Sequence, residues 1–496
     1  MMTPHLSITK KLQRILQGVV SLLLPMLQLQ SVMGGDIYVD NLRGDDANAG
    51  TQESPFRSIK VAAKVLKGGD TLHMVPNTNP YTLEDTVEPG AVGLIELVSS
   101  QAGTPEKPTI VDGHGSKVLG LFHYKSEKWR DEGSSVFSMR LPNNTVTMFN
   151  LGYWAGVIPI VFFDGKPAQW VKSREELVDG SFFLVKKLAK EEPPNNTLFV
   201  KLAEGKTPAD IKITAPSNVT IQSNTNHVTF RNIDSSYSSF DGFGSFWGKG
   251  LLFENLRASF CMNQGISHHS SAGVLVKNCR FDHNVDCGVL DVSLGDAKSG
   301  DEKAATRARY ENCLVDNNVW LGGVRFQNRG EYEMDSCIIR DNHAKTAVVS
   351  VAGNTSLILT NCLIVRGDAN AKTGIMAEAN STLELRNCTI VGYPNGLIVQ
   401  GGAKVLVSNS VFIDCETAIS VPLDPAPRRI ESDKNCFIGK PSFKVDQQTI
   451  GSLEDFAEMS GLDVNSVDLE KESELKPQAG RVYGANVNPD NVGLKK

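Results

Sequence analysis

The sequence lacks the short motifs by which several large enzyme classes are recognised. It shows no Ser–His–Asp order typical of a hydrolase triad, no glycine-rich loop placed to cradle a phosphate, and no zinc-ligand spacing. Beyond one stretch near the N-terminus, it also lacks apolar runs long enough to span a bilayer. Function must therefore be inferred from how the remaining residues are arranged along the chain.

The N-terminal segment has the features of a secretory signal. Lys10, Lys11 and Arg14 precede an apolar run over residues 15–27, and small residues follow it. The run is short for a transmembrane helix, and a retained anchor is the alternative. The sequence predicts a signal peptide over residues 1–34 and a mature protein that is secreted, periplasmic or on the cell surface.

Charge argues against nucleic acid as a partner. The net charge is −6 at pH 7, and loss of the signal would remove three further positive charges. A chain of this sign is not built to bind nucleic acid or an anionic membrane. Any polyanionic ligand would have to meet a local basic patch.

A short sequence motif recurs along the second half of the chain. Each copy alternates apolar and polar residues and then reaches an Asn, or once a Ser. These residues are Asn232, Asn255, Asn278, Asn312, Ser336, Asn361, Asn387, Asn409 and, in a worn ninth copy, Asn435. Successive positions lie 22 to 26 residues apart, except for one interval of 34. A repeat of this length predicts a stacked solenoid.

The pattern inside each copy indicates strands. Val274 and Val276, and then Cys279 and Phe281, are apolar pairs two residues apart, and a second strand follows near Gly288. Two or three short strands per copy form one coil of a parallel β-helix. The Asn side chains can then bond the turn backbone and one another along the stack. A leucine-rich horseshoe is the rival, but the segments between copies lack helical periodicity.

Two stretches outside the repeats add a resemblance. The first is an entry segment with Tyr38, Asp40, Gly44, Asp45, Asp46, Asn48, Gly50, Pro55, Phe56, Ser58, Ile59, Gly69 and Asp70, and the second is Ile110–Gly113. With them the chain resembles the secreted right-handed parallel β-helix proteins of the pectate-lyase-like superfamily, over residues 36–121 and 216–440. The resemblance implies a short helix capping the solenoid, and Ser58 before Ile59, Ala62 and Ala63 fits such a helix. These folds serve lyases, hydrolases and non-catalytic binders alike.

We therefore predict an all-β protein, a right-handed parallel β-helix with additions. The expected parts are the signal at 1–34, an N-terminal cap and first coils at 35–121, an inserted β-rich domain at 122–215, the repeats at 216–440, and a C-terminal tail at 441–496. The tail is expected to pack on late coils, whose outward column is apolar (Leu363, Val365, Val391, Val411 and Ile413).

Most of the nine cysteines share one column. Cys279, Cys313, Cys337, Cys362, Cys388 and Cys436 fall at the position that Ile233, Leu256 and Ser410 fill in other coils. A site that accepts Ile or Leu suits a small apolar filler rather than a disulfide or a metal ligand. The pairing of Cys261, Cys287 and Cys415 stays open.

One candidate catalytic group is His268, Asp291 and Arg325. His268 and Asp291 are one coil apart and should stack, with Arg325 on the next coil. A His–carboxylate pair beside a guanidinium could hold a uronate carboxylate while a base removes the adjacent carbon-bound proton. The alternative is a polar pair that bonds within its turn.

A second group is the stacked pair Asp282 and Asp316. Their carboxyl groups would lie about 5 Å apart, the separation that a retaining glycosidase uses. The alternative is a surface ladder in which Arg280 and Arg340 neutralise both. Further substrate-binding candidates are Asp241, His269, Asp282, His283, Asp316, Trp320, Gln327, Arg329 and Lys345, beside a charged loop at 293–303.

Asp40, Asp45 and Asp46 could bind Ca²⁺, although a capping turn is favoured because few carboxylates are present. We expect no metal or cofactor. The leading hypothesis is a monomeric carbohydrate-active protein that cleaves a polysaccharide, possibly one containing uronates, as a lyase. A retaining hydrolase using Asp282 and Asp316 and a non-catalytic glycan-binding or matrix protein are the alternatives, so whether the protein is an enzyme stays open.

Overall fold

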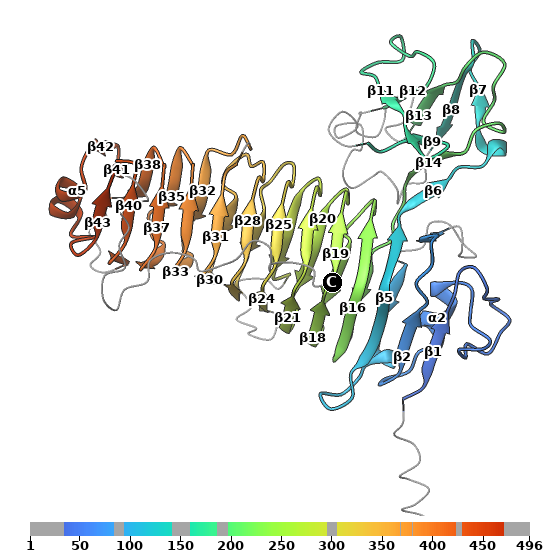
Figure 1. Cartoon of the computed structure of the whole chain (residues 1–496), viewed down its shortest axis with the longest axis horizontal. Helices are drawn as coiled ribbons and strands as arrows, with labels where there is room; N and C mark the ends of the chain where they lie inside the picture. Colours follow the sequence, from blue (N-terminus) through green and yellow to red (C-terminus); the bar gives the residue numbers. More distant parts are fainter. Residues whose placement is uncertain are drawn as a thin grey trace, which may run out of the picture.

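The chain forms a long stack of β-coils with a cap at each end (Figure 1). The computed structural model describes residues 34–83, 94–140, 159–185, 197–294, 305–367, 369–378, 380–422 and 429–470. Neighbouring strands of the stack pair in parallel, each with the equivalent strand one coil away. The predicted parallel β-helix is confirmed.

Each coil carries three strands, which form three faces. The first face contains β18 (Lys249–Glu254), β21 (Ala272–Lys277), β24 (Thr306–Glu311), β27 (Gly330–Asp335), β30 (Thr355–Thr360), β33 (Thr382–Arg386), β36 (Lys404–Ser408) and β39 (Ile430–Asp433). The second face contains β19 (Arg257–Ser259), β22 (Arg280–Asp282), β25 (Leu314–Asp316), β28 (Ile338–Arg340), β31 (Leu363–Val365), β34 (Thr389–Val391), β37 (Val411–Ile413) and β40 (Cys436–Ile438). Two long strands, β5 (Thr109–Leu119) and β16 (Val228–Ser236), run through both faces.

The third face is a separate sheet of 12 strands. It contains β4 (Ile95–Leu97), β15 (Ile221–Ser223), β17 (Phe243–Phe246), β20 (Gln264–His269), β23 (Cys287–Val292), β26 (Val324–Gln327), β29 (Val349–Val351), β32 (Thr373–Ala377), β35 (Asn395–Val399), β38 (Thr417–Val421), β41 (Ser442–Val445) and β42 (Gln448–Ile450). The apolar core lies between the three faces.

The repeated Asn forms the bend between the first and second faces. Its backbone is left-handed in coil after coil, with φ between 50° and 58° at Asn232, Asn255, Asn278 and their equivalents. Asn tolerates this conformation better than most residues with a Cβ. The side chains also bond along the stack, from Asn255 Nδ2 to Asn232 Oδ1 and from Asn312 Nδ2 to Asn278 Oδ1, both 2.7 Å. The expected ladder is confirmed.

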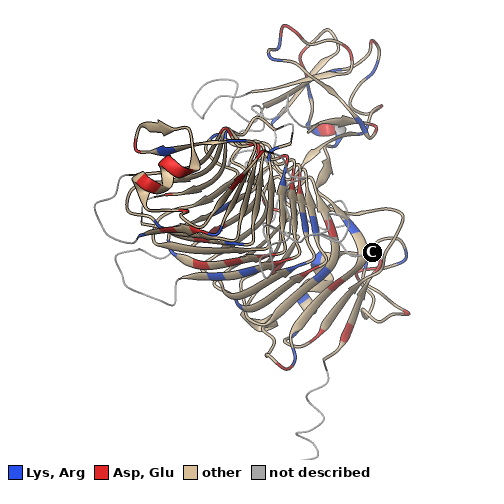
Figure 2. Cartoon of the chain, turned by 60° about the vertical axis from the view of Figure 1, so that its left-hand side comes forward, with Lys and Arg blue, Asp and Glu red and all other residues tan. Residues whose placement is uncertain are grey.

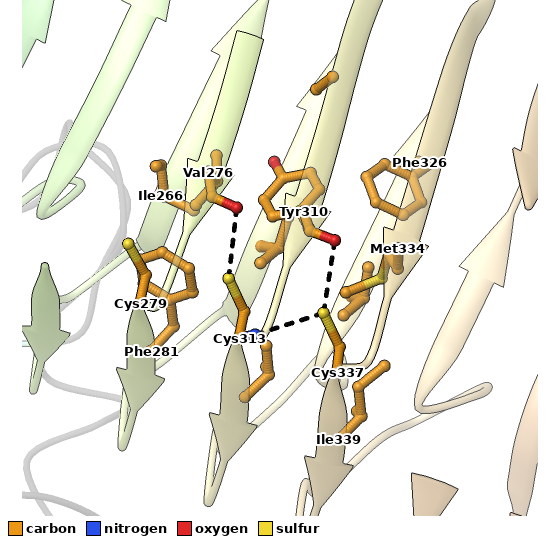
Figure 3. Close-up of a cluster of buried hydrophobic side chains, with 14 of the residues drawn as sticks. Ile266, Val276, Cys279, Phe281, Tyr310, Cys313, Phe326, Met334, Cys337 and Ile339 are labelled. Carbon is orange, nitrogen blue, oxygen red and sulfur yellow. Dashed lines mark hydrogen bonds between the residues drawn. The ribbon is translucent and has the colours of Figure 1, made fainter. Parts of the chain in front are cut away.

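The cysteines are free thiols in the interior (Figure 3). Cys313 Sγ donates to the Val276 carbonyl at 3.6 Å, and Cys337 Sγ to the Tyr310 carbonyl at 3.6 Å, so each thiol also bonds a backbone oxygen of the preceding coil. The core-filler interpretation is confirmed for the column from Cys279 to Cys388.

Cys436 is a correction to that column. It pairs with Val411, whereas Asn435 occupies the interior position next to Ser410 and donates to the Val407 carbonyl. The ninth copy is therefore shifted by one residue, which in a strand moves a side chain to the opposite face. Cys436 packs instead in a separate apolar cluster with Val411 and Ile438.

The entry segment closes the N-terminal end. β1 (Asp36–Val39), β2 (Thr71–Met74) and β3 (Tyr81–Thr82) pair in parallel with one another or with β5. The helix α2 (Ile59–Val65) begins after Ser58, whose hydroxyl accepts from the Val61 N–H, and buries Ile59, Ala62 and Ala63.

Residues between β5 and β15 form two small sheets that project from the side of the solenoid (Figure 1). One contains β6 (Leu121–His123), β9 (Phe162–Phe163), β10 (Lys166–Pro167) and β14 (Ile213–Pro216), and the other contains β7 (Arg130–Asp131), β8 (Val136–Arg140), β11 (Gln169–Trp170), β12 (Ser181–Leu184) and β13 (Thr197–Lys201). Their pairings are almost all antiparallel, unlike those of the coils.

The C-terminal part closes the other end. Ser452 caps α5 (Leu453–Ser460), whose Phe456 is fully buried and stacks on Phe443 at 4.6 Å. α5 therefore seals the end of the core and does not lie on the outward column of the late coils, where the C-terminal tail was expected to pack. That column is met instead by β43 (Val467–Leu469), which pairs with β40 and packs against Ile413.

The expected signal over residues 1–34 lies almost wholly outside the described residues, as does the chain after residue 470. Among the residues that are described, no helix combines the length and the apolar character needed to cross a bilayer.

The left-handed bend gives a test of the stack at Asn278. Replacing Asn278 with Ala or with Gly removes the same hydrogen bond to Asn312. Only the Ala variant has a Cβ, which is strained in the left-handed backbone conformation. We expect Asn278→Ala to be less stable than Asn278→Gly by about 1 kcal/mol, the reverse of the usual order in strands. Chemical denaturation of the two variants measures this difference. Equal stability, or a more stable Ala variant, would contradict the role assigned to this backbone conformation.

The C-terminal cap gives a second test. Phe456→Ala removes a buried ring that stacks on Phe443, so the free energy of unfolding should fall by about 3–5 kcal/mol. Met459 lies on the same helix but is 43% exposed, and Met459→Ala should change stability by no more than about 0.5 kcal/mol. Thermal and chemical unfolding compare the two. Similar effects from both would show that α5 does not seal the core.

Candidate functional site

The predicted group of His268, Asp291 and Arg325 is not assembled. His268 and Asp291 are register partners, as expected, but both side chains are fully buried inside the coil. Arg325 pairs with Leu290 and lies on the outer side of β26, while Phe326 takes the inward position beside Asp291. Alternation along a strand separates the residues, so the prediction of one surface site is wrong.

Their bonds are those of a neutral polar pair in a core. Ser245 Oγ lies 2.7 Å from His268 Nδ1, and Asp291 accepts from Tyr310 Oη at 2.7 Å and from the His268 N–H at 3.0 Å. Burial lowers the pKa of His268 to about 3 and raises the pKa of Asp291 to about 8. Both groups are therefore largely uncharged near pH 7, and neither reaches solvent.

A charged cluster does form on the outer side of the second face, from β19 to β28. Arg257 donates two hydrogen bonds to Asp282, Nε to Oδ1 and Nη2 to Oδ2, each 2.8 Å. Arg280 lies between the two predicted carboxylates, with Nε 2.9 Å from Asp282 Oδ1 and Nη2 3.3 Å from Asp316 Oδ2. Arg340 Nη2 is 3.6 Å from Asp316 Oδ2. The structure thus brings Asp282 and Asp316 together, under a layer of arginines.

The two carboxyl groups have different acidities. Burial alone would raise the pKa of Asp282, but the bonds from Arg257 and His283 outweigh it and hold that pKa well below its usual range. Burial raises the pKa of Asp316 above its usual value, in spite of Arg280. Both side chains are at most 1% exposed, whereas the arginines are 30% to 43% exposed. The surface that solvent meets is therefore formed by guanidinium groups.

His283 completes this cluster. Its Nδ1 lies 2.8 Å from Asp282 Oδ2, and its side chain is 41% exposed. Nδ1–H donating to the carboxylate leaves Nε2 as the acceptor nitrogen of the neutral ring. The His–carboxylate–arginine combination that we had sought at His268 is thus found at His283, Asp282 and Arg280, one residue beyond the second-face strand.

An aromatic ladder runs beside the cluster. Tyr237 stacks on Phe260 at 5.1 Å, and Phe260 stacks on His283 at 5.0 Å. All three have a left-handed backbone and follow directly on a second-face strand. The sequence analysis missed this ladder, although a spacing of one coil between these aromatic residues could have revealed it.

The inserted domain lies against the end of this ladder. Phe162 of β9 meets Tyr237 edge-on at 5.4 Å. Phe260, Met262, Val285 and Val319, from the corners of successive coils, share an apolar cluster with residues of the insert such as Phe137, Ile160 and Leu198. The insert therefore covers the corner between the second and third faces and borders the charged cluster.

The other predicted binding residues lie mostly on or near the third face. His269 stacks on Phe246 at 4.5 Å, next to Trp247, which is 63% exposed, and the Lys345 ammonium lies 4.0 Å from the centre of the Trp320 ring. Gln327 pairs with Val292 on the outer side of that face, and the Arg329 carbonyl accepts from Ser293 Oγ. Asp241 is buried at the start of this face. Most of the loop 293–303 lies outside the described residues.

The entry carboxylates are engaged in capping bonds. Asp40 accepts from the N–H groups of Leu42 and Arg43, Asp45 from that of Ala47, and Asp46 from the N–H and hydroxyl of Ser58. These are the bonds of a capping turn, the interpretation that the sequence favoured for this segment.

Charged groups on the strands give rows of acidic and basic residues across the coils (Figure 2). In the cluster on the second face, Arg257 pairs with Arg280 in one row and Asp282 pairs with Asp316 in the next, and each arginine lies beside at least one carboxylate. These contacts hold the guanidinium groups in place and leave part of each one exposed to solvent.

The buried acids predict a loss of stability at alkaline pH. The pKa of Asp291 is about 8 in the folded protein and near 4 in the unfolded chain. Its contribution to the free energy of unfolding is therefore fully present below about pH 4 and is lost as the pH rises through 8. Asp241, whose pKa is raised to about 7, also lowers the stability as the pH rises. His268, whose pKa is lowered by burial, changes the stability only below about pH 6.5. We expect the melting temperature to fall between pH 6.5 and 9, and to fall less in Asp291→Asn. Parallel curves for the two proteins would contradict this assignment.

Comparison with known proteins agrees with the architecture. The family model described as "Right handed beta helix region" matches residues 209–364 and 322–432. No curated protein matches the chain in sequence.

Similar solved structures include a complex of XylC with xylose (13% identity, 83% of this chain and 69% of that chain, TM-score 0.47) and a GH136 lacto-N-biosidase from Eubacterium ramulus (11%, 90% and 69%, 0.48). The pectate lyase Pel9A is also similar (13%, 78% and 77%, 0.42). The matched coils and the pairing of strands together make this chain a right-handed parallel β-helix protein.

Proposed function

We propose that this protein binds an acidic polysaccharide across the second face and cleaves it as a lyase, with His283 as the base. The observation that carries the proposal is the bond between His283 and Asp282 beside two arginines. Asp282 fixes the ring through Nδ1, so Nε2 is directed away from the carboxylate and can accept a proton.

Arginines supply the recognition. The guanidinium groups of Arg257, Arg280 and Arg340 are held from below by Asp282 and Asp316, and part of each faces solvent. A guanidinium presents paired N–H donors that match a carboxylate. A uronate carboxylate bound there would lie beside His283. The three arginines form the local basic patch that a polyanionic ligand needs on a chain of net negative charge.

The reaction follows from these positions. His283 Nε2 takes the proton from the carbon next to the uronate carboxylate, and the electron pair of that C–H bond moves towards the carboxylate. The arginines stabilise the enolate-like charge that develops. The pair then forms a carbon–carbon double bond as the glycosidic oxygen leaves with the proton returned by the imidazolium. The products are a new chain end and an unsaturated uronate.

The test is ultraviolet detection of unsaturated product on uronate polysaccharides such as polygalacturonate and alginate. We expect His283→Ala to lose at least about 100-fold in turnover, because a positioned base contributes roughly 10²–10⁴. The matched control is His343→Ala, a half-buried histidine on a turn two coils further along. Activity should survive in the control. Equal rates in both variants would remove His283 from the mechanism.

A retaining hydrolase is the second candidate, and the different acidities of Asp282 and Asp316 favour it. A low-pKa carboxylate beside a raised one is the pattern of nucleophile and acid. Both groups are nearly inaccessible beneath the arginines, so the substrate would have to displace Arg280. Products with a plain reducing end and no unsaturation would favour this candidate, and an intact glycan would favour a binding protein.

A further inference from the structure

The two ends of the solenoid carry charge of opposite sign. The helices α2 and α5 close opposite ends of the stack (Figure 1). Residues 54–69, which include α2, contain four basic residues and no acidic one. Residues 451–470, which include α5, contain six acidic residues and no basic one. None of these residues takes part in the proposed lyase chemistry.

The N-terminal end face is basic. The side of α2 that carries Ala62 and Ala63 is buried, so Lys60 and Lys64, which are four residues apart, lie on its outer side. Among the described residues, no carboxylate forms an ion pair with either lysine. Val65 at the end of the same helix is 44% exposed. This face therefore combines unpaired positive charge with an uncovered apolar side chain.

The C-terminal end face is acidic, and Figure 2 shows acidic residues on its helix. Phe456 is directed into the core, so Glu454 and Glu458 lie on the outer side of α5, where both are exposed. Within the described part of the chain, neither glutamate forms an ion pair. Like charges four residues apart on one helix repel, so a cationic partner would stabilise this face.

A hollow of about 600 Å³ extends the acidic face from α5 to the segment before β43. Its charged lining residues are Glu454, Glu458, Asp463 and Asp468, and none of the described residues that line it is basic. Asp463 is only 2% exposed, and its Oδ2 has no hydrogen-bond partner among the described residues. Val464, which also lines the hollow, is 65% exposed. The hollow therefore combines negative charge with an uncovered apolar side chain.

We propose that these two end faces dock on one another, so that the N-terminal face of one copy of this chain binds the C-terminal face of a second copy. Charge complementarity identifies the occupant, because lysines without a carboxylate at one end match glutamates without a cation at the other. Val65 at one end and Met459, 43% exposed, at the other supply apolar contact. Since the two faces lie at opposite ends of a rod, the contact does not close on itself, and copies add head to tail into open chains.

Sedimentation velocity tests this association on the chain without the expected signal at residues 1–34. At low salt the average sedimentation coefficient should rise with protein concentration. At high salt it should fall to the value of the monomer that the sequence predicts, because screening weakens the attraction between exposed charges. Lys60→Glu with Lys64→Glu reverses the N-terminal face, and Glu454→Lys with Glu458→Lys reverses the C-terminal face. Each pair should weaken association at least about tenfold, because attraction becomes repulsion.

A mixture of the two reversed variants gives the sharpest test. Neither variant should associate with itself. The reversed N-terminal face of the first matches the reversed C-terminal face of the second, and the two unchanged faces also match, so the mixture should associate as the wild type does. The matched control is Lys372→Glu with Lys404→Glu, which changes the net charge equally at two exposed lysines between the ends of the solenoid. This control should associate as the wild type does.

Four results would overturn the proposal. They are a wild type that stays monomeric at low salt, a mixture that stays monomeric, a control that weakens association as much as the end variants, and a loss caused by the C-terminal variant alone. The last result would place the acidic face against another basic surface, such as the arginines of the second face. Thermal melts check that each variant is folded. All variants should keep wild-type cleavage, so the outcome of the lyase assay does not bear on this contact.

Discussion

The left-handed bend between the first and second faces holds consecutive coils in register, and the rest of the solenoid depends on that register. At each bend from Asn232 to Asn409 a residue with φ between 50° and 58° turns the chain, and the amides of Asn255, Asn312 and Asn361 donate to the equivalent residue of the preceding coil. A second set of interior amides, Asn284, Asn318 and Asn342, does the same at the corner that follows the second face. Because polar groups at both corners are satisfied within the stack, the interior can be filled by apolar side chains and thiols.

A fixed register turns distance along the sequence into proximity. Residues one coil apart become neighbours on the same face, so charges placed at one position of the repeat collect into a ladder. On the second face this ladder pairs buried carboxylates with partly exposed arginines, and the carboxylates determine where the guanidinium groups point. The same geometry gives Asp282 and Asp316 different pKa values, because Asp282 receives short hydrogen bonds from Arg257 and His283, whereas burial outweighs the longer bond that Asp316 receives from Arg280.

The inserted domain gives the regular stack its asymmetry. It packs on Met262, Val285 and Val319 at the corner between the second and third faces, where Phe260 of the same apolar cluster stacks on His283 of the charged cluster. The late coils, with Leu363, Val391 and Ile413 at the equivalent outward positions, carry no such charges. The charged groups of the second face are therefore concentrated on the coils beside the insert.

Sequence alone determined the solenoid, because a repeat of 22 to 26 residues with strand-like alternation leaves few other ways to bury its apolar side. It also placed the Asn ladder, most of the cysteine column and the pairing of Asp282 with Asp316, which all follow from counting coils. It misplaced His268, Asp291 and Cys436, since a shift of one residue reverses the face on which a strand side chain lies. Which face each residue meets, and that His283 rather than His268 bonds a carboxylate beside arginines, was decided only by the tertiary structure, because the turns between strands set that alternation anew in every coil.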